Sequence, residues 1–386
     1  MVGGAVVAAV LLVGGAVAVG GLIGGSGSRA TVDVNVAGTA APTPTTTTVP
    51  PVPSDARTLH LVRTVVGNIA PKSVVASGTG LVTAQNMMYR HSVTVYDANG
   101  DLVTTIPDSV DLAAFGIAGH AGTSQGAPVE AAFTPDHTHF YVTNYSMYGA
   151  GFGPEGSDSC TASQHFDDSF VYRIDVKTMA IDQVIPVGAV PKYVAVTPDA
   201  KTVLVTDWCS YDMTVIDAKT AHPVARVPLG AWPRGIAVDP ASTTAFVAVM
   251  GDDSVARVDL ASRTVTATWP VGAAPRHVVM DPAGTALYVT LNGAGTVVKL
   301  DPHTGATLAE ARSGAAPRTM VMAPDGRSLY VVNYDDSTIT KLATADLAVL
   351  QVLPTDEHPI GITYEPTRGR VWVAGYAGSL QIYDDR

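Results

Sequence analysis

The chain has 386 residues and a net charge of −11, and charged side chains make up only 15% of it. An acidic chain lacks the broad positive potential that attracts nucleic acids and anionic membrane surfaces, so neither is expected to bind the folded part. The 37 glycines and 26 prolines are typical of a fold with many tight turns.

The first segment, residues 1–28, contains no charged side chain. Its apolar stretch 2–25 is long enough to cross a bilayer, for which about 20 residues suffice. No Lys or Arg precedes it and no small-x-small cleavage site follows it, so it favours a transmembrane anchor. An uncleaved signal, or a signal peptide whose start is misassigned, stays open as the alternative.

The second segment, residues 29–56, is rich in Pro and Thr and predicts an extended, disordered linker. An anchor, a spacer and a folded head suggest a single-pass protein of the cell membrane with its head outside the cytoplasm. Arg29 alone argues for the opposite orientation under the positive-inside rule. A larger receptor with a cytoplasmic part upstream of Met1 is a further alternative.

The remaining residues, 57–386, are organised by a repeated phrase of Pro, a residue that is basic in most copies, and a short apolar run. Five of its prolines follow one another at steps of 42 residues, namely Pro191, Pro233, Pro275, Pro317 and Pro359. Propeller blades repeat at about 40–50 residues, and a fixed period of that size indicates one unit stacked many times.

Each unit predicts four short antiparallel strands. The unit 273–314 contains four runs rich in Val, Leu, Tyr and Thr, separated by Pro-x-Gly and Asn-Gly turns. Pro71 and Pro128 open two earlier units with insertions, which makes seven. The last unit lacks its fourth strand, and an unassigned strand at 58–67 supplies it. We therefore expect an all-β, seven-bladed β-propeller that is closed by its N-terminal strand.

The second strand of the second unit reads Tyr141-Val142-Thr143-Asn144, and related strands occur at 204–207, 288–291 and 330–333. With the period of 42, this resembles the YVTN family of β-propeller repeats, beside the lactonase-like, NHL-like and streptogramin-lyase-like propellers. The strands 246–249 and 372–375 depart from the motif. The resemblance implies the fold, and it implies a lactonase-like hydrolase or a lyase only as an alternative activity.

Two cysteines are present, Cys160 in a long insertion of the second unit and Cys209 in the third. The two loops occupy equivalent positions in adjacent blades, so a disulfide is expected to fasten the insertion. Two unrelated thiols, or a zinc site with His165, are the alternatives.

The basic residues of the phrase are expected at the mouth of the central channel. We call this end the upper face; it carries the loops between second and third strands and the connections from each blade to the next. The residues after the prolines include Lys72, Lys192, Arg234, Arg276 and Arg318, and the next positions include Glu130, Tyr193 and His277. This pattern predicts a basic funnel for an anionic ligand, with Glu130 and His277 as candidate catalytic proton-transfer groups. Alternatively, each Pro-Arg pair binds turn acceptors between blades.

Further candidates for ligand contact do not repeat: Arg90 and His91 in the upper loop of the first blade, and Trp208 and Trp232 near the third. The sequence thus predicts a monomeric binding module for a small anionic ligand or a protein partner. No cofactor or metal ion is expected, although acidic pairs in upper loops leave room for a divalent cation. Arginines buried in hydrogen bonds between blades would count against the funnel.

Overall fold

A computed structural model describes residues 52–386 of the chain, so the expected anchor at 1–28 and most of the expected linker lie outside the described residues. Within 52–386, no helix is long and apolar enough to cross a membrane. Regular structure there consists of strands and three short 3₁₀ helices, η1 (Ser54–Ala56), η2 (Leu112–Phe115) and η3 (Met250–Asp252). The expected all-β architecture is confirmed.

Seven antiparallel sheets form the seven blades, and six of them have four strands. Blades one to three contain β2 (Ser73–Ala76), β3 (Leu81–Asn86), β4 (Ser92–Asp97), β5 (Leu102–Pro107); β6 (Ser109–Asp111), β7 (Thr123–Phe133), β8 (His139–Tyr148), β9 (Ser169–Asp175), β10 (Ala180–Val187); and β11 (Pro191–Val196), β12 (Thr202–Asp207), β13 (Asp212–Asp217), β14 (His222–Pro228).

Blades four to seven follow the 42-residue period. They contain β15 (Pro233–Val238), β16 (Thr244–Val249), β17 (Ser254–Asp259), β18 (Thr264–Pro270); β19 (Pro275–Met280), β20 (Leu287–Leu291), β21 (Thr296–Leu300), β22 (Thr307–Arg312); β23 (Pro317–Met322), β24 (Ser328–Asn333), β25 (Thr338–Ala343), β26 (Val349–Pro354); and β27 (Pro359–Glu365), β28 (Arg370–Gly375), β29 (Ser379–Asp385), β1 (Leu59–Val66).

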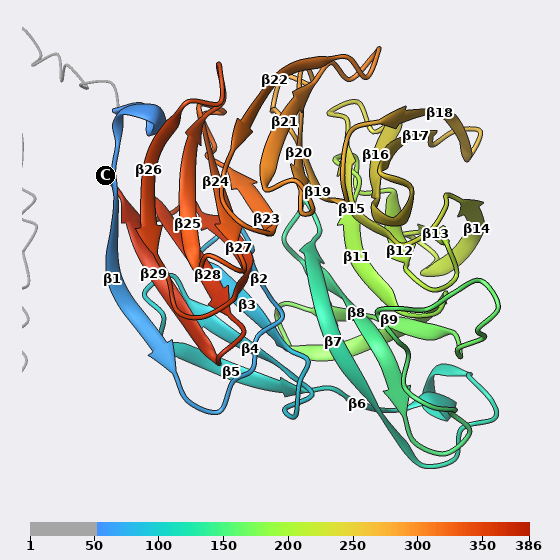
Figure 1. Cartoon of the computed structure of the whole chain (residues 1–386). Coiled ribbons are helices and arrows are strands. Elements are labelled where there is room, and N and C mark those ends of the chain that lie inside the picture. The colour runs from blue at the N-terminus through green and yellow to red at the C-terminus, as the bar shows by residue number, and fades with distance from the viewer. Residues whose placement is uncertain (1–51) are drawn as a thin grey trace, which may run out of the picture. The chain divides into compact units, whose positions relative to one another are not determined.

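The ring is closed by the N-terminal strand, as the sequence predicted. β1 pairs antiparallel with β29, from Leu59 opposite Asp385 to Val66 opposite Ser379. Figure 1 shows β1 in blue beside β29 in red, so the first and last strands of the described chain share one sheet. The first strands of consecutive blades contact one another all the way around, from β2 through β27 and back to β2. They therefore surround the central channel.

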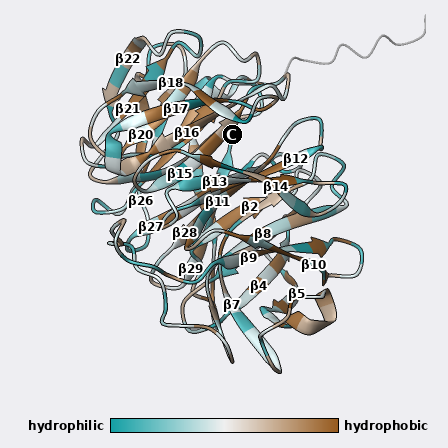
Figure 2. Cartoon of the chain, turned by 90° about the vertical axis from the view of Figure 1, so that its right-hand side faces the viewer, coloured by the Kyte–Doolittle hydropathy of each residue, from teal (hydrophilic) through white to brown (hydrophobic). Residues whose placement is uncertain are grey.

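The core lies between the blades, where apolar faces of neighbouring sheets meet. Trp372 of blade seven is fully buried and packs near Tyr96 of blade one, with their ring centroids 6.2 Å apart. In Figure 2, hydrophobic colour is concentrated on the strands and hydrophilic colour on many connecting loops. The inner strands of each sheet thus bury both faces, and they read as nearly continuous apolar runs. The outermost strands, such as β18, are largely exposed.

The insertions of blade two extend its sheet at the upper face. β7 and β8 are longer than their counterparts, β6 adds a fifth strand, and Gln125 pairs with Tyr148 beyond the usual end of the ladder. A separate apolar cluster that includes Leu112 and Met147 fills the space beneath. The insertion is therefore a packed structure that stands beside the channel mouth.

Candidate functional site

The opening residues of the inner strands form β-bulges at the channel mouth. In blades three to six, the pairing of first and second strands is interrupted directly after the opening proline, and the interruption includes the basic residue. A bulge leaves its extra residue without a pairing partner and changes the direction of its side chain. In each of these four blades, the repeated phrase therefore turns one basic side chain out of the ladder.

Five basic side chains gather at this place, which we call the cation cluster: Lys72, Lys192, Arg234, Arg276 and Arg318. Burial and, to a smaller extent, the positive charge of Arg234 lower the pKa of Lys72 to about 7. Burial also lowers the pKa of Lys192 and of Arg276. Each cation thus feels both the loss of water and the charges of the others, which favours an added anion.

The arginines of the cluster lack a full set of acceptors, and two of the three are buried. Arg234 and Arg276 are 7% and 8% exposed. The Nε atoms of Arg276 and Arg318 are buried and have no hydrogen-bond partner in the described part of the chain, and Nη1 of Arg276 reaches only the sulfur of Met250 at 3.7 Å. Arg318 lies over the ring of Tyr334, 3.9 Å from its centroid. These contacts leave N–H donors of the guanidinium groups without oxygen acceptors. The alternative expectation, that the arginines bind turn acceptors between blades, is therefore not met at Arg276 and Arg318.

One carboxylate from the blade-two insertion enters the cluster. Asp158 forms an ion pair with Lys192, whose side chain is 2% exposed, whereas that of Asp158 is 67% exposed. Burial opposes ionisation of Asp158, but the charge of Lys192 outweighs it and holds the pKa of Asp158 well below its ordinary value. The Lys192 ammonium also lies 4.1 Å from the ring centroid of Tyr145. Asp158 is therefore a permanent anion at the mouth of the channel.

A disulfide and two tryptophans fix the insertion that carries Asp158. Cys160 and Cys209 are bonded, with their Cα atoms 5.8 Å apart. Trp208 donates its indole N–H to the carbonyl of Asp158 at 3.2 Å, and Trp232 donates to the carbonyl of Cys160 at 3.0 Å. The two indoles stack with their centroids 5.7 Å apart.

The tryptophans were expected to form an exposed recognition surface, and for Trp208 this expectation is wrong, because it is only 5% exposed. Both indole N–H groups are used to hold the insertion backbone. A buried indole needs an acceptor for its N–H, which the insertion supplies. Trp208 and Trp232 thus both position the insertion backbone, and Trp232 is half-buried.

The two candidates in blade one also lie apart from the channel cavity. Arg90 is exposed on the loop between β3 and β4. His91 is half-buried, its Nδ1 lies 2.7 Å from the carbonyl oxygen of Gly126, and its ring packs edge-on against Tyr148. His91 thus connects blade one to the extended part of blade two.

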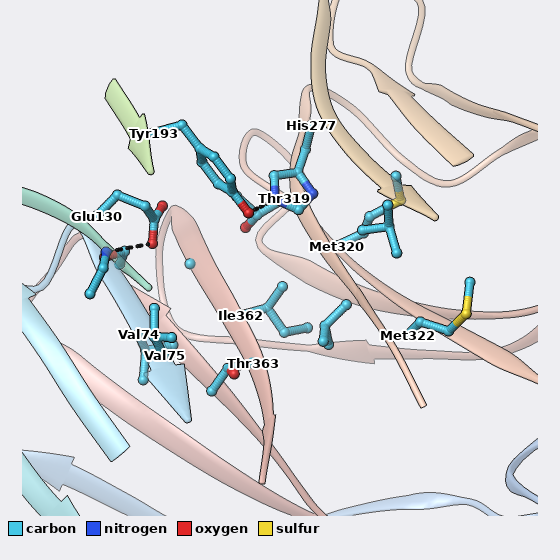
Figure 3. Close-up of a pocket in the computed structure, with 15 residues that line it drawn as sticks. Val74, Val75, Glu130, Tyr193, His277, Thr319, Met320, Met322, Ile362 and Thr363 are labelled. Atoms are coloured by element: carbon cyan, nitrogen blue, oxygen red, sulfur yellow. Dashed lines mark hydrogen bonds between the residues drawn. The ribbon is translucent and has the colours of Figure 1, made fainter. Parts of the chain in front are cut away.

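A cavity of about 210 Å³ is lined by the residues that follow the cation cluster. Its upper wall is polar, with the side chains of Ser73, Glu130, Tyr193, His277 and Thr319, and its lower wall is mostly apolar, with Val75, Met320 and Ile362. Figure 3 shows the phenol of Tyr193 pointing toward the imidazole of His277. The hydroxyl of Tyr193 and Nε2 of His277 are 3.0 Å apart.

The two catalytic candidates of the sequence analysis therefore line one cavity. Burial, helped by the charges of Arg234 and Arg276, lowers the pKa of His277 to about 3, so its imidazole is neutral at physiological pH. Burial raises the pKa of Glu130 to about 7, although the charge of Arg234 opposes this. Glu130 is accordingly the group in the cavity wall that exchanges a proton near neutral pH.

The raised pKa of Glu130 gives a pH-dependent contribution to stability. A carboxyl group whose pKa is raised on folding stabilises the fold fully below its unfolded-state pKa, and this contribution is lost as pH rises through the folded-state pKa. Between about pH 4.5 and 7, the wild type should therefore lose stability relative to Glu130→Gln, by roughly 3 kcal/mol in total. Urea unfolding of both proteins from pH 4 to 9 measures this, and parallel curves would contradict it.

Three site residues were not identified from the sequence: Asp158, Tyr145 and Tyr334. Asp158 and Tyr145 belong to the insertion, which has no counterpart in the other blades. The sequence offered one signal for Asp158, its position two residues before Cys160. Tyr334 follows the second strand of blade six directly and stacks under Arg318.

Comparisons with known proteins support the fold and do not name a family. No protein-family model matches the chain. No curated protein matches it either. Among solved structures, the chain is similar to a chain of hydrazine synthase from Kuenenia stuttgartiensis, with a TM-score of 0.65 and 19% identity over 82% of this chain and 96% of that one. This likeness supports the fold alone, and the chain is accordingly a seven-bladed β-propeller.

Proposed function

We propose that the chain is a membrane-tethered, extracytoplasmic propeller of the YVTN type that binds a small anionic ligand at the upper mouth of its central channel. One observation carries the proposal: five basic side chains converge in the cation cluster, and three of them, Lys192, Arg234 and Arg276, are more than nine-tenths buried. The apolar segment 2–25 and the Pro/Thr-rich segment after it support the tether, and the disulfide supports an oxidising location.

The energetics favour a ligand over a structural role for the cluster. Burial of a charge without a partner costs several kcal/mol, and nearby like charges add to this. A structural arginine would gain hydrogen bonds in return, but the buried Nε of Arg276 has no partner in the described chain. Guanidinium groups bind carboxylates and phosphates with paired, charge-assisted hydrogen bonds. An oxyanion would supply the missing acceptors.

The proposal is tested by isothermal titration of the purified full-length protein with acetate, phosphate and citrate at constant ionic strength. We expect at least one of these anions to bind. Arg276→Gln should weaken that binding by about tenfold to a hundredfold, which is the loss of one charged hydrogen-bonding group. The matched control is Arg257→Gln, because Arg257 is hydrogen-bonded to Thr266 in the outer part of blade four.

Arg257→Gln should change the affinity by less than about twofold, since its charge lies outside the cluster. Arg276→Gln should also be at least as stable as the wild type, because it removes a buried, incompletely paired charge. Failure of all three anions to bind, or equal losses in the two variants, would overturn the proposal.

A propeller hydrolase or lyase that acts in the same cavity is the second candidate. It is favoured by the position of Glu130, whose pKa of about 7 suits proton transfer, beside the Tyr193–His277 pair. In such an enzyme, Glu130→Gln would abolish turnover of an anionic substrate and leave its binding intact. In a pure binding protein, the wild type would leave the bound anion chemically unchanged.

A further inference from the structure

Asp158 differs from Glu130, the other carboxyl group of the site, because the charge of Lys192 keeps its pKa well below the ordinary value and it stays ionised at neutral pH. We infer that Asp158 occupies the place of one oxyanion group of the ligand, and that the ligand is a free small organic polyanion with two or more such groups, as in a di- or tricarboxylate or a phosphate ester. This inference rests on the proposed anion binding and specifies its ligand.

The balance of charge calls for more than one anionic group. The ion pair uses only Lys192. Three arginines, Arg234, Arg276 and Arg318, remain without an ion-pair partner in the described chain, and Arg234 and Arg276 are 7% and 8% exposed. Lys72, whose pKa is about 7, adds a partial positive charge at neutral pH. Glu130 interacts with the charge of Arg234, but its pKa of about 7 leaves it only partly ionised at neutral pH. A monoanion would leave most of this charge uncompensated, whereas a polyanion would compensate several cations at once.

The depth of the cations argues for a free small molecule. Side chains as buried as Lys192, Arg234 and Arg276 are out of reach of a membrane surface or a folded protein partner. The cavity of about 210 Å³ beneath them limits the body of the ligand. Its upper wall offers the hydroxyl groups of Ser73, Tyr193 and Thr319, which suit a polar ligand body.

The position of Asp158 makes it a competitor for the ligand. Its carboxylate is two-thirds exposed at the mouth, while its backbone is held by the indole of Trp208. The insertion therefore delivers one carboxylate to the cluster at a high and constant effective concentration. An incoming oxyanion can reach Lys192 only by displacing Asp158, and loss of Asp158 should strengthen binding.

Titration calorimetry of the full-length protein with citrate, phosphate and acetate tests both parts of the inference, at pH 7 and constant ionic strength. Citrate or phosphate should bind at least about tenfold more tightly than acetate, because each added negative charge attracts a further cation of the partly buried cluster. Asp158→Asn should tighten the binding of citrate by about fivefold to tenfold. Asp168→Asn is the matched control, since it removes the same charge from the same insertion at a side chain that pairs with Arg226.

Each outcome has a distinct meaning. If acetate binds as well as citrate, the polyanion assignment is wrong and the anion site stands. If no anion binds, the proposed function is wrong as well. If Asp158→Asn weakens the binding of citrate while Asp168→Asn does not, Asp158 organises the site rather than standing in for the ligand. If the Asp158→Asn variant does not fold, the Asp158→Ser variant is measured instead. It also removes the charge, so it distinguishes the same outcomes.

Discussion

Replacement of Asp385 by asparagine should lower the free energy of unfolding by about 3–5 kcal/mol, the usual loss when one partner of a buried ion pair is removed. The side chains of Asp385 and Lys341 are fully buried, and their charged atoms lie 2.7 Å apart. Asp385 also accepts a hydrogen bond of 2.7 Å from the hydroxyl of Tyr330. The variant leaves the Lys341 ammonium buried without its counter-charge, at the junction of blades six and seven.

The neighbouring Asp384 provides the control. It pairs with Arg370 at 2.9 Å, but both side chains are partly exposed, so Asp384→Asn should cost only about 1 kcal/mol or less. Urea denaturation of both variants, followed by circular dichroism, measures the difference. Equal losses in the two variants would show that burial of the Lys341–Asp385 pair does not stabilise the closed ring.

Removal of the disulfide should have the second large effect. The bond between Cys160 and Cys209 closes a loop with a sequence separation of 49 residues. A cross-link of this length stabilises a fold by roughly 4 kcal/mol in the chain-entropy description. The double variant Cys160→Ser and Cys209→Ser should therefore unfold at a clearly lower denaturant concentration. It should bind anions at least as tightly as the wild type, because the cation cluster lies outside the insertion and a loosened insertion holds Asp158 less firmly against Lys192.

The reduced wild type is the natural comparison for this variant. Treatment with a reductant breaks the same bond without a change of side-chain volume, so the two proteins should show similar midpoints of unfolding. A loss below about 1 kcal/mol in both would mean that the tryptophans alone hold the insertion. Loss of anion binding in the folded double variant would mean that the insertion forms part of the cation site.

The repeat made most of the fold predictable, because the same short-range pattern of strands and turns occurs in seven units. Turns of the Pro-x-Gly and Asn-Gly type mark strand ends wherever they occur, so the period of 42 residues and the unassigned strand at 58–67 were enough to predict the closed ring. The basic residues that follow five of the seven opening prolines were likewise visible in the sequence of an otherwise acidic chain. The basic side chains were expected to meet at one channel mouth, because the first strand of every blade starts at that end of the channel.

The rest of the site depends on contacts that no repeat encodes. The sequence does not show whether Arg276 meets acceptors between the blades, since this depends on side-chain packing at a bulge. Asp158 reaches Lys192 only because an irregular insertion folds back over the channel. Trp208 was expected at the surface as a ligand contact, and its burial arises from the same insertion. Unique segments fold through long-range contacts, so they are harder to infer than repeats.

The short helix η1 fastens the chain to blade six just before the strand β1 that closes the ring. Ser54 donates hydrogen bonds to the carboxylate of Asp325 from its backbone N–H at 2.7 Å and from its hydroxyl at 2.6 Å, and Asp55 pairs with Arg327 at 2.8 Å. Both partners lie on the turn between β23 and β24 of blade six. A force that arrives through the preceding residues therefore loads blade six first, and β1 is not pulled from β29 until these bonds have broken.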